Sequence, residues 1–123
     1  MLFDTLDELS TNLRRLLESG CYVWEEPDGR RILLNTRERV GTINGLSIAI
    51  YSDEHNPPHF HVRSPHINAT FTLADCTLLT GEVDRKTRDL ILYWYAERKD
   101  NLIAVWNRTR PTRGPTDVFT PHT

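Results

Sequence analysis

The sequence lacks the features that assign many proteins to a functional class. No hydrophobic run approaches the ~18 residues that a membrane span needs, and the N-terminus, MLFDTLDELS, is acidic and does not resemble a signal peptide. No P-loop, dinucleotide-binding glycine motif or GxSxG nucleophile motif is present. These absences argue against a membrane protein, a nucleotide-binding protein of the common Gly-rich types and a Ser/His/Asp hydrolase.

The number of cysteines and the net charge are also small. Cys21 and Cys76 lie far apart and neither belongs to a CxxC pair, so we expect two buried, reduced thiols in a cytoplasmic protein rather than a disulfide or a metal pair. The net charge of −2 gives no general attraction for nucleic acid, which would need a local patch to bind.

The length and composition are those of one globular domain. The chain has 123 residues, of which 26% are charged and 38% hydrophobic. Such a chain can bury roughly two thirds of its unfolded surface. We expect a single domain over residues 1–108, followed by a flexible tail over 109–123, because the segment RPTRGPTDVFTPHT has three prolines and no periodicity.

The first third of the chain predicts a helix and a hairpin. Residues 4–19 have leucines at helical spacing, with Asp4 as the expected N-cap and Gly20 as a good residue just past the C-terminus. The runs CYVWEE and RILLN flank the turn PDGR, in which Asp28-Gly29 favours a left-handed conformation. This arrangement predicts a β-hairpin over residues 21–35.

The rest of the chain predicts a small sheet followed by helix. Strands are expected at residues 46–52, 59–63, 67–73 and 76–81. From an N-cap at Asp84 the apolar spacing becomes helical as far as about Arg108, in one helix or in two that meet near Asp100-Asn101. The predicted fold class is α+β: an N-terminal helix and hairpin, a small, mostly antiparallel sheet, and a C-terminal helical segment packed on that sheet.

One short segment, HNPPHFHV at residues 55–62, places three of the five histidines around two prolines. Each proline fixes its own φ and favours extended geometry in the residue before it, so the pair predicts a stiff corner that leads into a strand. Side chains alternate between the two faces of a strand. The expected faces are Phe60 and Val62 towards the core, and His59, His61 and Arg63 on the opposite side.

The sequence leaves three interpretations of these histidines open. They are structural groups on a half-exposed strand, or they form a metal-free phosphate and acid–base site in which Arg63 holds an anion. The catalytic set in that second case is His55, His59, His61 and Arg63. In the third interpretation they bind a divalent metal such as zinc, iron, nickel or manganese. The candidate metal ligands are His55, His59, His61 and His66, with Asp53 as a further carboxylate.

Two longer runs resemble a known family. These are INGLSIAIYSDEHNPPHFHV and NATFTLADCTLLTGEVDRKTRDLILYWYAERKDNLIAVWN, and they resemble the bacterial domain-of-unknown-function family four-one-six-zero. The matching parts are the HNPPHFH string, the LLxGE-like turn, Trp94 and Trp106. The resemblance implies a family core over residues 43–108, with 2–42 as an N-terminal extension. It also implies a small bacterial protein of a toxin–antitoxin or phage-defence module, and it implies no particular reaction.

Two functions of different classes follow as expectations. As an enzyme, the protein would be a metal-assisted or histidine-driven phosphodiesterase acting on RNA or a nucleotide. As a binding module, it would be an antitoxin or adaptor that docks a partner. Residues 2–42 contain more apolar side chains than the core is expected to cover, so we predict a homodimer or a small protein partner through this segment, and no membrane association.

Overall fold

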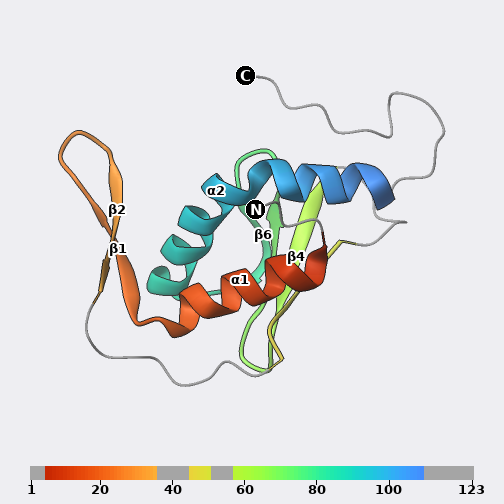
Figure 1. Cartoon of the computed structure of the whole chain (residues 1–123), viewed down its shortest axis with the longest axis horizontal. Helices are drawn as coiled ribbons and strands as arrows, with labels where there is room; N and C mark the ends of the chain where they lie inside the picture. Colours follow the sequence, from red (N-terminus) through yellow and green to blue (C-terminus); the bar gives the residue numbers. More distant parts are fainter. Residues whose placement is uncertain (1–4, 36–44, 51–56, 110–123) are drawn as a thin grey trace.

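The computed structural model describes residues 5–35, 45–50 and 57–109, and it confirms the predicted α+β class (Figure 1). One sheet is the two-stranded β1–β2 hairpin, and the other is an antiparallel meander in the order β3-β4-β5-β6. No helix within the described ranges is long and apolar enough to cross a membrane. The elements are α1 (Leu6–Glu18), β1 (Cys21–Glu25), β2 (Arg31–Asn35), β3 (Ser47–Ala49), β4 (His59–Arg63), β5 (Asn68–Thr72), β6 (Leu78–Glu82) and α2 (Arg85–Thr109).

The first helix forms as predicted but begins with a different cap. Asp4, the expected N-cap, lies outside the described residues, and the cap is Thr5, whose side chain accepts a hydrogen bond from the Glu8 N–H at 3.1 Å. Thr5 has extended backbone angles, as an N-cap requires. Gly20 follows the helix with a φ of 81°, which confirms its predicted role as the residue that ends the helix.

α1 is part of the main core. Leu9 and Leu13 are completely buried, and the Ser10 hydroxyl accepts a hydrogen bond from the Ile48 N–H on β3 at 2.8 Å. On the other side, the Asn12 side-chain oxygen accepts bonds from Trp94 Nε1 at 2.9 Å and from Arg98 Nε at 3.2 Å, both on α2. Three leucines of this helix, Leu9, Leu13 and Leu17, are therefore covered by the chain itself, while Leu6 and Leu16 are half-buried.

α2 is one continuous helix through Asp100-Asn101. It begins as predicted, since the Asp84 carboxylate accepts the Thr87 N–H at 2.7 Å, and this bond lowers the pKa of Asp84 from its ordinary value. The helix continues because its buried stripe continues on the far side of the polar pair. The buried residues there are Leu102, Ile103, Val105 and Trp106.

The core lies between the two helices and one face of the four-stranded sheet. Figure 1 shows both helices crossing the same side of that sheet. Phe60 is fully buried at the centre, with its ring 5.6 Å from that of Phe71 and 6.4 Å from that of Tyr95, measured between centroids. The Tyr95 hydroxyl donates to the Leu73 carbonyl at 2.6 Å, which fixes α2 to the end of β5.

The last strand begins two residues later than predicted, at Leu78 instead of Cys76. The reason is a hydrogen-bonded turn, in which the Asp75 carboxylate accepts bonds from the Thr72 and Thr77 hydroxyls, each at 2.6 Å. Cys76 lies within this turn at a φ of 58°. Its thiol is buried, which raises its pKa to about 12 and makes it a poor nucleophile. Cys21 is half-buried, and neither cysteine is in a disulfide.

Candidate functional site

The face of the four-stranded sheet opposite the core is almost entirely polar. β4 alternates as predicted, because Phe60 and Val62 are completely buried while their neighbours point the other way. The strand register places His59 beside Thr72 and His61 beside Thr70. The same face contains Ser47, Ala49, His59, His61, Arg63, Asn68, Thr70, Thr72, Thr80 and Glu82.

His59 and His61 form a close pair on this polar face. Their ring centroids lie 5.4 Å apart and their planes meet at 72°, in an edge-to-face arrangement. His59 Nδ1 lies 2.6 Å from the Pro57 carbonyl oxygen. Because a carbonyl oxygen only accepts, Nδ1 must carry the proton, and Nε2 carries the lone pair of the neutral ring. The proline corner therefore sets both the position and the tautomer of His59.

Thr70 holds the second histidine of the pair. Its hydroxyl lies 3.1 Å from His61 Nδ1, and its side chain is almost fully buried at 7% exposure. The hydroxyl can donate or accept, so either tautomer of His61 fits this bond. Both rings are thus oriented by a hydrogen bond at Nδ1, the arrangement that fixes imidazoles in acid–base sites and in metal sites.

Trp106 contacts His59 from the last turns of α2. The two ring centroids lie 5.8 Å apart, and the indole is only 2% exposed. The sequence pattern did not place this tryptophan at the site, since helical spacing does not show where the end of a helix docks. Its place in the family resemblance was the one signal that could have pointed to the site. The indole therefore lies against the His59 ring.

The other predicted site residues are more distant or fall outside the described ranges. Arg63 shares the polar face and is exposed at the end of β4. His66 is exposed in the turn between β4 and β5, where its backbone N–H donates to the Ser64 hydroxyl at 3.3 Å. His55 and Asp53 lie outside the described residues. Within residues 5–35, 45–50 and 57–109, no three His, Cys, Asp or Glu side chains are grouped closely enough to hold a metal ion.

Two adjacent imidazoles of this kind have a definite chemical capacity. One neutral ring can remove a proton while a protonated neighbour donates one. An arginine on the same face can bind an anionic group between them. The same two Nε2 atoms can also serve as metal ligands, with further ligands supplied from elsewhere.

The comparisons with known proteins identify the family and nothing beyond it. A family model described as "Domain of unknown function (DUF4160)" matches residues 45–107, the stretch from the start of the four-stranded sheet to the end of α2. The matched stretch includes His59, His61, Thr70 and Trp106. The search of curated proteins found no match, and neither did the search of solved structures. By the family match, which confirms the resemblance noted in its sequence, the chain belongs to this family of unknown function.

Proposed function

We propose that the protein is a histidine-driven phosphodiesterase and that RNA is its substrate. The observation that carries the proposal is the His59–His61 pair, whose rings lie edge to face at 5.4 Å on a polar sheet face. Each ring is oriented through Nδ1, by the Pro57 carbonyl in one case and the Thr70 hydroxyl in the other. Such preorganisation is what a positioned acid and base require.

The roles follow from the chemistry of the groups. One imidazole removes a proton from the attacking hydroxyl, and the other protonates the oxygen that leaves phosphorus. Arg63, on the same face, stabilises the charge that develops on the phosphate oxygens. Thr70 and Trp106 hold the two rings without taking part in proton transfer. His55, two residues before the corner, completes the site in this proposal.

The experiment is a cleavage assay on purified protein that has no histidine tag. A fluorescent single-stranded RNA is incubated across a range of pH, and the rate is expected to rise and fall with pH because one histidine must be neutral and the other protonated. His59→Ala and His61→Ala should each lower the rate by about 10²- to 10⁴-fold. His66→Ala is the matched control for the metal-free mechanism, in which it should cleave at the wild-type rate. Equal rates in all four proteins would show that the activity is a contaminant.

A divalent metal is the main alternative within the same proposal. The candidate ions are zinc, iron, nickel and manganese, held by His59 and His61 together with His55 or His66. Elemental analysis of the untagged protein, and a thermal melt with and without a chelator, separate the two versions. Stoichiometric metal and a melting temperature that falls with the chelator would replace the metal-free mechanism with a metal-assisted one.

A non-catalytic binding module is the second candidate, in the form of an antitoxin or adaptor. The observation that favours it is the apolar hairpin, where Trp24 is 52% exposed, so that residues 2–42 would dock a protein partner. We place either activity in the cytoplasm, within a toxin–antitoxin or phage-defence module, on the basis of the family resemblance. A double His59→Ala, His61→Ala variant discriminates the two, since a binding module should keep its partner and its biological effect.

Replacement of Pro57 and Pro58 by alanine should affect cleavage more than stability. Both backbone carbonyls remain, including that of Pro58, which accepts the Leu73 N–H at 2.9 Å. The expected loss of stability is about 1 kcal/mol, from added freedom in the unfolded chain. Cleavage should fall further, because His59 would no longer be held in one orientation. Pro65→Ala, in the exposed β4–β5 turn, is the control for thermal melts and rates. Wild-type cleavage by the double variant would limit the corner to a structural role.

A further inference from the structure

The hairpin has apolar side chains on both of its faces. Its register places Cys21, Val23 and Leu33 on one side, and all three pack against the core. The opposite side differs from the polar face of the larger sheet, because it consists of Tyr22, Trp24, Ile32 and Leu34. Trp24 is the most exposed of the large apolar residues within the described ranges. Figure 1 shows the hairpin projecting from the body of the molecule.

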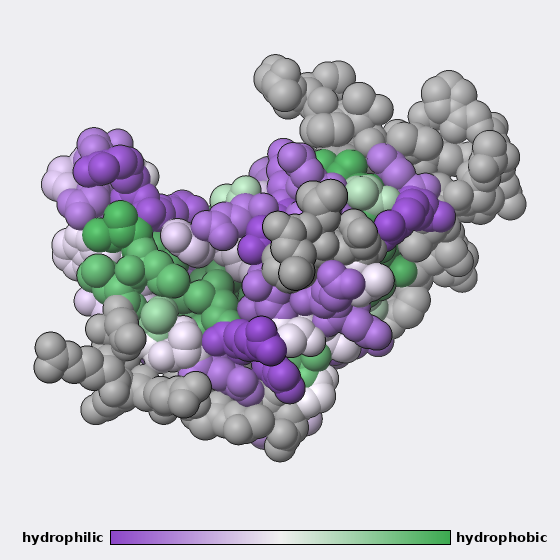
Figure 2. All heavy atoms as spheres, viewed as in Figure 1, coloured by the Kyte–Doolittle hydropathy of each residue, from purple (hydrophilic) through white to green (hydrophobic). Residues whose placement is uncertain are grey.

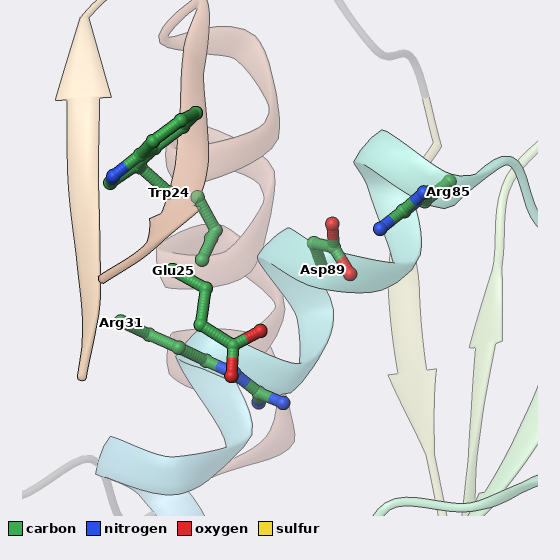
Figure 3. Close-up of a pocket in the computed structure, with 6 residues that line it drawn as sticks. Trp24, Glu25, Arg31, Arg85 and Asp89 are labelled. Carbon is green, nitrogen blue, oxygen red and sulfur yellow. The ribbon is translucent and has the colours of Figure 1, made fainter. Parts of the chain in front are cut away.

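A groove lies between the hairpin and α2, on the side of the hairpin that carries Val23, Glu25 and Arg31, and Trp24 also lines it. A cavity of about 270 Å³ is lined by Val23, Trp24, Glu25, Arg31, Arg85 and Asp89 (Figure 3). A second cavity of about 360 Å³ shares Val23, Arg85 and Asp89 with it and adds Tyr22 and Lys86. The two cavities are therefore one groove between the hairpin and the first turns of α2. Figure 2 shows a continuous apolar surface on the hairpin side of the molecule.

The charges that line the groove are mixed in sign. Arg31, Arg85 and Lys86 are positive, while Glu25 and Asp89 are negative. In Figure 3, Glu25 and Arg31 extend side by side from the hairpin, and Asp89 and Arg85 line the facing wall on α2. A nucleic acid needs a surface of one positive sign. A surface with both signs complements itself when a twofold axis brings each cation to a carboxylate of the other copy.

We propose that the occupant of this groove is a second copy of the chain. In the twofold arrangement, Trp24 of each copy enters the groove of the other, and Glu25 of each faces Arg85 of the other. A standard interface covers roughly 800 Å² per partner, so we expect a stable contact to use the groove as well as the hairpin face. Trp, Tyr and Arg, the residue types that dominate binding energy at interfaces, line it.

This proposal is independent of the proposed catalysis, because the hairpin lies outside the family match and outside the His59–His61 site. It defines an interface for the protein: the hairpin joins two copies, and the polar face of each four-stranded sheet stays available for substrate. The dimer therefore exists whether or not RNA is cleaved, and loss of the dimer leaves the histidine pair intact.

The test is sedimentation and light scattering of the full chain up to millimolar concentration. The expected result is a reversible dimer of twice the 14.3 kDa chain mass, with a shift of tryptophan emission to shorter wavelength on association. Trp24 alone causes that shift, because Trp94 and Trp106 are already buried. Trp24→Ala should weaken the dimer by at least tenfold, with an unchanged circular dichroism spectrum. Leu79→Ala, at the other large exposed apolar side chain within the described ranges, should leave it unchanged.

Charge reversal tests the pairing itself. Glu25→Arg and Arg85→Glu should each weaken association by about tenfold or more, and the two changes together should restore it. Arg85→Glu places an acid in the first turn of α2, where it favours the helix, so folding is retained. A wild-type chain that stays monomeric at millimolar concentration would overturn the proposal. So would a dimer that Trp24→Ala leaves unchanged, or a double reversal no tighter than the single ones.

Discussion

Gly81→Ala should lower the free energy of unfolding by about 3 kcal/mol or more, because two costs combine at this position. Gly81 has a φ of 87°, where a residue with a side chain is strained by about 1–3 kcal/mol. A Cβ there would also overlap the Asn68 carbonyl oxygen on the neighbouring strand. That carbonyl belongs to β5, which is paired on both sides and has little room to move. The glycine of the LLxGE-like motif is thus explained by close contact between strands.

Gly29→Ala provides the matched control. Gly29 has nearly the same φ, 90°, but a Cβ added there meets no atom within 4 Å. Its replacement should therefore cost only the backbone strain, about 1 kcal/mol at the low end of that range. Denaturant unfolding of both variants measures the difference. Equal costs for the two glycines would mean that β5 and β6 do not pack as closely in solution as they do in the structure.

Phe60→Ala should cost about 3–5 kcal/mol of stability, the usual range for removal of a buried phenyl ring. The ring is completely buried and contacts Phe71, Trp94 and Tyr95, with centroids 5.6 to 6.4 Å away. The large cavity left behind would lie between the sheet and α2, where both sides are fixed by further contacts. Thermal and denaturant unfolding are the measurements.

His61→Ala, one residue further along β4, is the control for Phe60→Ala, because the two side chains lie on opposite faces of the same strand. His61 points to the polar face and is only half-buried, so its loss should cost about 1 kcal/mol, the value of its bond to Thr70. The difference between the two losses of stability shows how much more the buried face of β4 contributes to folding than the polar face. If the two substitutions cost the same, both faces are needed for stability and the histidines are structural groups.

Local patterns in the sequence predicted most of the elements. β4 was predicted with its observed bounds, because the Pro57-Pro58 corner fixes its start and alternation fixes its faces. The hairpin followed from Asp28-Gly29 and two β-prone runs, and α1 from its leucine spacing. The predicted start of β6 was wrong. The side chains of Thr72, Asp75 and Thr77 form a hydrogen-bonded turn that competes with the strand, and strand propensity alone does not show that the turn is the more stable of the two.

The contacts that build the site required the three-dimensional structure. Sequence placed His59 and His61 on one face, but Thr70 became the partner of His61 only through strand register. Trp106 reaches His59 because α2 continues unbroken past Asp100-Asn101. α1 is covered through the hydrogen bonds of its Ser10 with β3 and of its Asn12 with α2, which lie tens of residues away in the sequence. Pairings at such separations have no local signature.

In the proposed function, His59 and His61 bind a phosphodiester on the polar face of the sheet. Nuclear magnetic resonance of the imidazole nitrogens, during titration with a diribonucleoside monophosphate, tests it most directly. We predict that the neutral His59 ring carries its proton on Nδ1, and that the His59 and His61 signals shift together as ligand is added while those of His66 do not. A His59 ring protonated at Nε2, or a titration in which neither signal moves, would contradict the account.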